Sequence, residues 1–238
     1  DLIHVNEITL LFLGLLAKRI WQVPLVMHVR SLQCSPGSSW RTRRIHAWLR
    51  QHADAVVAID HTVAATLGPA LPLHVVHNGL AVQPGSGSSG RVPDGVVRVG
   101  FLGVLVPLKG VFELVEAIRL LRDRGVAVAC LVAGENARHL SGLKAWLLAR
   151  FGFARDVRAE LEAFIERERL QDRVSLLGFV ADVRSIYEQL DILCFPSHLD
   201  AAGRPVFEAA FHGVPSVVAI NNPLPDAVVD GVTGLAVP

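Results

Sequence analysis

The stretch VVRVGFLGVLVPLKGVFELVEAIRLLRD, residues 96–123, decides the fold. Its apolar opening, 96–102, predicts a buried strand, and a loop bounded by glycines follows at 103–110. Beyond the loop, apolar side chains recur at helical spacing while charged side chains take the opposite face, so an amphipathic helix follows. A second apolar run at 126–133 completes a strand–helix–strand unit, whose two strands lie parallel in one sheet.

The same alternation of apolar runs and helical patterns extends along the whole chain, so the predicted fold class is α/β with parallel sheets. The runs are continuous, as expected of strands that are covered on both faces. In the first part, the predicted strands are 2–5, 25–29, 55–59 and 73–76, with helices at 8–21 and 40–51. Farther on, the predicted strands are 96–102, 126–133, 174–177, 192–195 and 216–220, with helices at 111–122, 182–189 and 205–212.

The chain divides at a segment rich in Gly, Ser and Pro. Residues 84–95 show no apolar periodicity, and we predict an interdomain linker there. A partial first domain, 1–83, precedes it, and a doubly wound second domain, 96–238, follows it. Because the sequence opens directly on a strand and stops at the start of another, we expect truncation at both ends.

Composition excludes several functional classes. Lys plus Arg (23) nearly balance Asp plus Glu (22), so the chain has no net positive electrostatic field that would attract nucleic acid. The three cysteines, Cys34, Cys130 and Cys194, are far apart, and the last two lie in apolar runs. This pattern predicts a reducing compartment and no structural metal bound by cysteine. The most apolar stretch, 8–17, is too short to span a bilayer, and no secretory signal opens the chain. We therefore expect a cytoplasmic protein.

Ligands of open parallel sheets bind at the carboxyl ends of the strands, so the loops there carry the candidate site. In the first loop, Lys109 directly precedes a helix, where a cation can reach a phosphate that also meets the helix N-terminus. Taken alone, Lys109 is explained better as a solvated lysine at a helix start. The glycine spacing is not that of a P-loop, and no GxGxxG fingerprint supports a nicotinamide dehydrogenase.

A second loop, 196–208, is more specific. Gly203 lets the backbone approach a ligand, Pro205 suits a first helical turn, and free N–H groups there favour an anion. Asp200 and Glu208 lie on either side of that helix start. Their spacing alone is also typical of acids that stabilise a helix dipole.

Ordered motifs in the second domain resemble those of the family 4 retaining glycosyltransferases. They are LKG at 108–110, LGFV at 177–180, DILCFPS at 191–197, the acids Asp200 and Glu208, and PDAVVDGVTGL at 225–235. The first domain resembles the family more weakly, through DLIHV at 1–5, VMH at 26–28, ADAVVA at 53–58 and NG at 78–79. The family's opening strand with its glycine-rich loop is not found.

The resemblance implies a GT-B fold of two Rossmann-like, doubly wound parallel-sheet domains facing a cleft, the first domain being incomplete. It implies transfer of a sugar, with retention, from a nucleotide diphosphate sugar of the UDP or GDP type to a glycan, polysaccharide or lipid-linked acceptor. No metal and no cofactor are expected, because a lysine and helix-end amides can stabilise the departing diphosphate.

The resemblance also implies a role for each matching residue. Lys109 would hold the diphosphate, and the backbone near Gly203 and Arg204 would cap it. Glu208 would bind the ribose hydroxyls, and Asp200 would contact the donor sugar. Phe179 and Val180 would hold the base. The expected donor-binding set also contains Gly103, Gly134 and Ala202.

Two departures from the family pattern support an alternative. Val104 stands where the family usually has an arginine on the diphosphate, a loss for which Arg204 is a candidate replacement. A charge-assisted hydrogen bond is worth roughly 1.5–3 kcal/mol, so the loss is substantial. Asp200 replaces a glutamate. The alternative is a degenerate or truncated homologue that binds a nucleotide sugar or a partner without catalysis.

Further candidates lie outside the donor motifs. His28 is an acceptor-side candidate, with a hydrogen-bonded core histidine as the equal alternative. Asn6 is weaker, because it could equally cap the following helix. His74 and His77 would lie on opposite faces of a strand and do not predict a metal site. Two basic aromatic segments, 40–50 and 144–155, suit peripheral contact with an anionic membrane or, as we favour, core helices with a solvated basic face.

Overall fold

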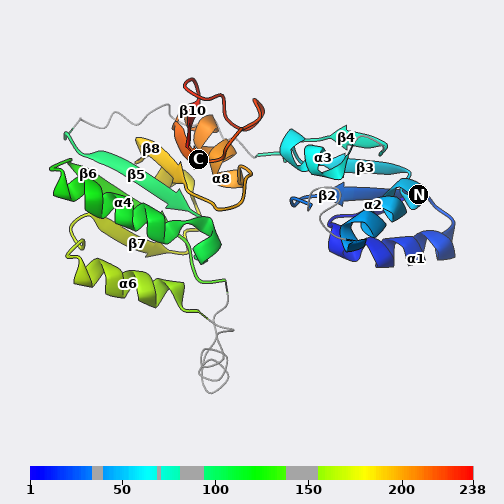
Figure 1. Ribbon diagram of the computed structural model, residues 1–238, viewed down its shortest axis with the longest axis horizontal. Helices are drawn as coiled ribbons and strands as arrows, with labels where there is room; N and C mark the ends of the chain where they lie inside the picture. The colour runs from blue at the N-terminus through cyan, green and yellow to red at the C-terminus, as the bar shows by residue number, and fades with distance from the viewer. Residues whose placement is uncertain (34–39, 69–70, 81–93, 138–154, 238) are drawn as a thin grey trace, which may run out of the picture. The chain divides into compact units, whose positions relative to one another are not determined.

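The computed structural model describes residues 1–33, 40–68, 71–80, 94–137 and 155–237. The chain forms two compact units (Figure 1). Unit 1 comprises Asp1–Ala81 together with the short segment Leu224–Ala227, and unit 2 comprises Val82–Pro223 and Val228–Pro238. Among the helices of the described residues, none combines the length and the apolarity that crossing a membrane requires.

Unit 1 is built on a four-stranded parallel sheet in the order β1-β2-β3-β4. The strands are β1 (Ile3–Val5), β2 (Leu25–Val29), β3 (Ala55–Ala58) and β4 (Leu73–Val75). The helices are η1 (Ile8–Leu10), α1 (Leu11–Trp21), α2 (Trp40–His52) and α3 (His61–Leu67). Leu25, Met27 and Val29 are fully buried on alternate positions of β2, so this strand lies at the centre of the unit's core.

The helix α3 was not predicted from the sequence. It has only seven residues, and Thr62 and Val63 are β-branched, which weakens its intrinsic preference for a helix. Tertiary structure supplies the stability instead. The buried carboxylate of Asp60 accepts the backbone N–H of Val63 at 2.6 Å as an N-cap, and Val63 and Leu67 pack into the core of unit 1.

Unit 2 contains a six-stranded parallel sheet in the order β10-β9-β8-β5-β6-β7. The strands are β5 (Val97–Leu102), β6 (Val128–Ala133), β7 (Val174–Gly178), β8 (Ile192–Phe195), β9 (Ser216–Ala219) and β10 (Gly234–Val237). Because β5 pairs with β6 on one side and with β8 on the other, the order of the strands reverses between β5 and β8. Such a reversal is the switch point at which doubly wound sheets bind ligands.

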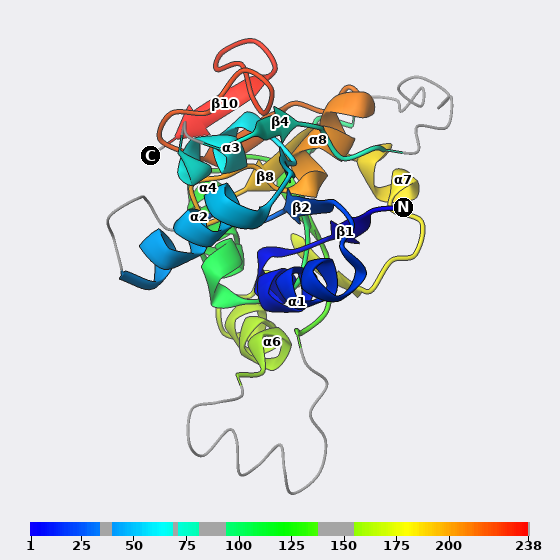
Figure 2. The same ribbon diagram turned by 90° about the vertical axis from the view of Figure 1, so that its right-hand side faces the viewer.

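Helices cover both faces of this sheet. They are η2 (Pro107–Lys109), α4 (Val111–Asp123), α6 (Val157–Arg167), α7 (Arg184–Tyr187) and α8 (Arg204–Phe211). Figure 1 shows α4 and α6, and Figure 2, turned by 90°, also labels α7. Phe101 of β5 packs in the core with α4 and α6, whereas Leu102 packs in the opposite core with α7 and α8. Successive residues thus enter opposite cores, which explains the continuous apolar runs.

The helix α6 was also missed by the sequence-based prediction, although its signal is present. Val157, Leu161 and Ile165 are buried at helical spacing, and Asp156 caps the helix by accepting the N–H of Ala159 at 2.9 Å. The predicted linker, 84–95, and the basic segment 144–155 lie almost entirely outside the described residues.

The two described cysteines, Cys130 and Cys194, are free thiols on buried strands, as predicted. Burial raises the pKa of both thiols, to about 11 for Cys194. Cys34 lies outside the described residues. The two described thiols are therefore packing groups with low reactivity.

Two glycines, Gly110 and Gly125, share a left-handed backbone but differ in how closely they are packed, so substituting each measures the packing at the switch point. Gly110 and Gly125 have φ of 72° and 77°, but a Cβ at Gly110 would overlap the carbonyl oxygen of Pro196, whereas a Cβ at Gly125 would meet nothing within 4 Å. We expect Gly125→Ala to lower the free energy of unfolding by about 1 kcal/mol and Gly110→Ala by about 3 kcal/mol. Urea denaturation measures both, and equal losses would contradict the close packing.

Candidate functional site

The reversal in strand order brings two loops together at the carboxyl edge of unit 2. One follows β5 and the other follows β8. The backbone N–H of His198 donates to the carbonyl oxygen of Leu108 at 3.0 Å, and His198 Nε2 lies 2.8 Å from Glu113 Oε1. Gly110 packs directly against the carbonyl group of Pro196. The two loops therefore form one continuous surface.

Three glycines continue this edge along the neighbouring strands. Gly103, Gly134 and Gly178 stand at the carboxyl ends of β5, β6 and β7. The N–H of Gly134 donates to the carbonyl oxygen of Gly178 at 2.8 Å, and a Cβ on Gly134 would overlap the carbonyl oxygen of Gly103. Two of the predicted donor-site residues, Gly103 and Gly134, thus lie side by side, with no side chain to keep a ligand from the backbone.

Lys109 lies at the end of η2, directly at the switch point. Its ammonium group lies over the ring of Phe195, 5.1 Å from the centroid, and burial lowers the pKa of this lysine. Within the described residues, no hydrogen-bond acceptor or carboxylate pairs with the ammonium group. The simpler explanation, a solvated lysine, does not fit this half-buried side chain. A partly desolvated cation without a counter-ion is stabilised by an incoming anion.

The start of α8 contacts the same aromatic ring. Gly203 caps α8, and a Cβ at this position would lie only 2.6 Å from Cζ of Phe195. In the part of the chain that is described, the backbone N–H groups of Gly203 and Arg204 have no acceptor. Free N–H groups at a helix N-terminus favour an anion. Phe195 therefore brings Lys109 and the start of α8 together, although they are far apart in the sequence.

Glu208, one turn into α8, is held by two donors. The Tyr187 hydroxyl donates to Oε2 at 2.8 Å, and Arg204 Nε donates to Oε1 at 2.6 Å. Burial raises the pKa of Tyr187 far above its ordinary value, so the phenol stays protonated and can donate. A carboxylate has about four lone-pair sites, so Glu208 can accept about two further hydrogen bonds. The Arg204 side chain is 69% exposed and turns to Glu208.

The other predicted donor-site residues also lie in loops on this edge. Phe179 follows β7 and is 78% exposed, while Val180 and Ala202 pack against the core that contains α7 and α8. Asp200 follows β8, and its Oδ1 accepts the N–H of Asn221 at 3.0 Å. That bond fixes the Asp200 carboxylate beside the end of β9.

Three residues of this surface were not predicted to have a role: Tyr187, Phe195 and His198. Phe195 lies within the quoted DILCFPS motif and His198 within the loop 196–208, but only the folded chain shows that Phe195 contacts both Lys109 and Gly203. Tyr187 did leave a signal, because it is the only tyrosine of the chain and occupies the apolar side of α7. A buried tyrosine usually has a hydrogen-bond partner, and here the partner is Glu208.

In unit 1, the two acceptor-side candidates have different environments. His28 lies within β2 and stacks on His4, with ring centroids 5.6 Å apart. Its Nε2 is buried and finds no hydrogen-bond partner in the described structure, so the alternative of a hydrogen-bonded core histidine is not supported. Burial lowers the pKa of His28, with a smaller contribution from Arg30, which favours the neutral imidazole.

Asn6 follows β1 and is exposed. The alternative that Asn6 caps the next helix is wrong. Glu7 occupies the cap of η1, and its Oε1 accepts the N–H of Ile8 at 2.8 Å. The glutamate side chain is long enough to bend back to the N–H of the next residue. The usual preference for asparagine at N-caps therefore gave the wrong residue here.

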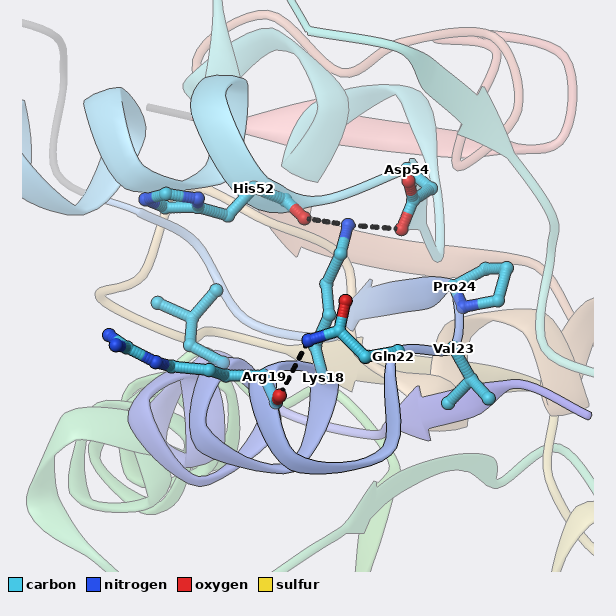
Figure 3. Close-up of a pocket in the computed structure, with 8 residues that line it drawn as sticks. Lys18, Arg19, Gln22, Val23, Pro24, His52 and Asp54 are labelled. Atoms are coloured by element: carbon cyan, nitrogen blue, oxygen red, sulfur yellow. Dashed lines mark hydrogen bonds and ion pairs between the residues drawn. The ribbon is translucent and has the colours of Figure 1, made fainter.

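A separate hollow of about 570 Å³ opens at the amino edge of the unit 1 sheet (Figure 3). It is lined by Leu15, Lys18, Arg19, Gln22, Val23, Pro24, His52 and Asp54. Lys18 Nζ donates to Asp54 Oδ2 at 2.6 Å and to the His52 carbonyl oxygen at 2.7 Å, and the Lys18 hydrogen bond lowers the pKa of Asp54. Lys18 and Asp54 satisfy one another, unlike Lys109, so we do not assign the site there.

Comparison with family models matches both parts of the chain. The model described as "Glycosyl transferases group 1" matches residues 89–238, and the model described as "Glycosyl transferase 4-like domain" matches residues 1–79.

Individual proteins show the same similarity. The chain is 23% identical to a glycogen synthase of Mycobacterium tuberculosis, a match that covers 99% of the chain and 56% of that protein. It is 28% identical to a D-inositol 3-phosphate glycosyltransferase of Kribbella flavida, over 100% of the chain and 59% of that protein. The chain thus spans little more than half the length of these relatives.

Solved structures agree with the sequence comparisons. Anabaena Alr3699/HepE, in complex with UDP and glucose, is 26% identical with a TM-score of 0.76, covering 100% of the chain and 64% of that protein. Sucrose-phosphate synthase from Thermosynechococcus elongatus is 19% identical with a TM-score of 0.73, covering 100% of the chain and 60% of that protein, a likeness of fold. The α/β class and the two parallel-sheet GT-B domains predicted from the sequence are confirmed.

The two partners of Glu208 differ in burial, so their removal has different effects. Tyr187→Phe leaves a carboxylate that is only 16% exposed with one partner fewer, and we expect the free energy of unfolding to fall by about 1–2 kcal/mol. Arg204→Ala removes a partner that is itself 69% exposed and water can replace it, so the loss should be smaller, less than about 1 kcal/mol. Urea denaturation of both variants compares them, and a larger loss for Arg204→Ala would show that the tyrosine bond is not the stronger support.

Proposed function

Because the chain belongs to the glycosyl transferases group 1 family, we propose that it binds a nucleotide diphosphate sugar in unit 2 and transfers the sugar to an acceptor with retention of configuration. The acceptor class that we propose is a glycan, a polysaccharide or a lipid-linked sugar. Since the chain spans little more than half of its curated relatives, the activity is proposed for the protein that contains this chain.

One observation carries this proposal. The Lys109 ammonium is half-buried over Phe195 and has no counter-ion in the described residues, while the start of α8 presents free N–H groups on the same ring. A diphosphate supplies the missing anion to both groups at once. In a partly desolvated site, such preorganised donors stabilise the charge that develops on the leaving diphosphate. They can do so without a metal ion, and we propose that transfer is metal-independent.

We propose the remaining contacts with the donor from the positions of the loop residues. Glu208 has acceptor capacity for the two ribose hydroxyls beyond its bonds to Tyr187 and Arg204. Phe179 and Val180 directly follow the end of β7, and we expect their backbone to hold the base. Asp200, fixed by Asn221, is the residue that we expect to contact the donor sugar.

In the transfer step that we propose, the bond between the anomeric carbon and the phosphate oxygen breaks, and the acceptor oxygen bonds to the same face of that carbon. The acceptor proton passes to the departing phosphate oxygen, which Lys109 and the α8 amides stabilise. On the acceptor side, neutral His28 could donate or accept one hydrogen bond through its unpartnered Nε2. Nuclear magnetic resonance of the product would report the anomeric configuration.

The base that we favour is uracil. Alr3699/HepE, with 26% identity, is solved in complex with UDP and with UDP-glucose. A second candidate function is binding of a nucleotide sugar without turnover. The observation that favours it is Val104, which is 49% exposed and supplies no second cation for the diphosphate beside Gly103.

We also propose that unit 1 contacts an anionic membrane surface through α1 and α2. The exposed apolar side chains of α1 are Phe12, Leu13, Leu16, Ile20 and Trp21. The exposed cations of the two helices are Arg19, Arg43, Arg44 and Arg50. Neither helix contains an acid, and the Phe12 ring meets Trp48 of α2 at 4.7 Å, so apolar and basic groups share one surface. That combination matches anionic lipid, and we propose the cytoplasmic side of a membrane.

Calorimetric titration with UDP, GDP and ADP tests the donor site. We expect one nucleotide to bind without magnesium, and both Lys109→Met and Glu208→Ala to weaken that binding at least tenfold, because each removes a partner of the diphosphate or the ribose. Lys18→Met is the matched control, because Lys18 lies at the amino edge of unit 1, and should bind normally. Failure of every nucleotide to bind folded protein would reject the donor site.

Vesicle flotation tests the membrane surface. The protein should float with phosphatidylcholine vesicles that contain phosphatidylglycerol and remain below vesicles of phosphatidylcholine alone. Leu16→Glu combined with Ile20→Glu should abolish flotation, because two carboxylates then face the lipid. Val232→Glu, at a position of unit 2 that is 79% exposed, is the control and should float. Absence of flotation of the unaltered protein with anionic vesicles would reject this contact.

A further inference from the structure

Three potential metal ligands cluster at the carboxyl edge of the unit 1 sheet. His61 follows β3 at the start of α3, His77 follows β4, and Asp226 belongs to the segment Leu224–Ala227 of the same unit. Their ligand atoms, His61 Nδ1, His77 Nε2 and one carboxylate oxygen of Asp226, all lie within 4.8 Å of one another. None of the three has a role in the proposed donor site.

In this cluster, more potential hydrogen-bond donors surround one carboxylate oxygen of Asp226 than that oxygen can accept. Asp226 Oδ2 lies 3.0 Å from the His61 backbone N–H, 2.9 Å from His61 Nδ1 and 3.0 Å from His77 Nε2. One carboxylate oxygen has about two lone-pair sites, so three donors exceed its capacity. Meanwhile Oδ1 of the same carboxylate is buried and has no partner among the described residues. A ring nitrogen that does not donate has a lone pair available for a cation.

The spacing suits a small metal ion. Zinc bonds nitrogen at roughly 2.0–2.1 Å, which places tetrahedral ligand atoms roughly 3.3 Å apart. The ring nitrogens stand at 2.9 and 3.0 Å from the carboxylate oxygen, so small rotations of exposed imidazoles would open the site. The His61 and His77 side chains are 58% and 51% exposed, and solvent can therefore deliver the ion.

The local charge also favours a cation. Asp60, which is buried at the N-cap of α3, interacts electrostatically with both Asp226 and His77. Two carboxylates near one another repel, and a divalent ion between the histidines and Asp226 would offset that repulsion.

We propose that His61, His77 and Asp226 bind one divalent transition-metal ion of the zinc type. Imidazole nitrogen with a carboxylate favours zinc, copper or nickel over magnesium or calcium, which prefer oxygen ligands. Three protein ligands leave a fourth position for water. The ion holds the segment Leu224–Ala227 against the ends of β3 and β4 and so stabilises unit 1.

Zinc titration of untagged, chelator-treated protein tests the site. Calorimetry should show one zinc ion per chain at micromolar affinity or tighter, and cobalt substituted at the site should give the visible absorption of a four-coordinate ion. His61→Ala, His77→Ala and Asp226→Asn should each weaken zinc binding at least tenfold. His74→Ala, which removes an exposed histidine of β4, is the matched control and should bind zinc normally.

Asp226→Asn keeps the shape of the side chain, so weaker zinc binding by this variant reports the loss of a ligand. Circular dichroism would show whether the variant is still folded. Magnesium should not compete with zinc. Zinc binding that all three ligand variants retain, or no zinc binding by the unaltered protein, would overturn the proposal and leave a hydrogen-bonded cluster only. Zinc binding is measured without nucleotide, so its result does not depend on whether the transferase proposal is correct.

Discussion

The pairing of β5 with both β6 and β8 is the constraint on which unit 2 depends. This strand holds the two halves of the sheet together, and its residues enter the cores on both faces. Because the strand order reverses there, the chain must leave the carboxyl ends of β5 and β8 in diverging directions. The loops that carry Lys109 and Gly203 both reach Phe195 at this edge.

The two charged groups of this edge are prepared for a ligand in opposite ways. Lys109 lacks a counter-ion among the described residues, so an arriving anion recovers part of the cost of its burial. Glu208 is already compensated by Tyr187 and Arg204, so its carboxylate is held in place before any ligand arrives. The first group contributes affinity and the second contributes geometry, because a restrained acceptor loses little freedom on binding.

The features that depend on local spacing could be predicted from the sequence. The strands β2 and β8 match their predicted bounds because each is an apolar run that ends at a polar residue or at proline. Contacts between distant residues could not be predicted, since spacing does not specify them. His198 meets Glu113 across 85 positions, and His61 meets Asp226 across 165 positions. The helix α3 was missed for a related reason, because its stability comes from the Asp60 cap and the core.

The position of Phe195 has a consequence for redesign of donor preference. One ring supports both Lys109 and the cap of α8, so any smaller side chain would release two groups at once. Such a position tolerates little variation, whichever donor the proposed site binds. Variation is better tolerated at Phe179, whose side chain is 78% exposed, and at Asp200, whose exposed carboxylate holds only the N–H of Asn221. A library built to change the donor preference of the proposed site should therefore vary those two exposed positions and keep Phe195 constant.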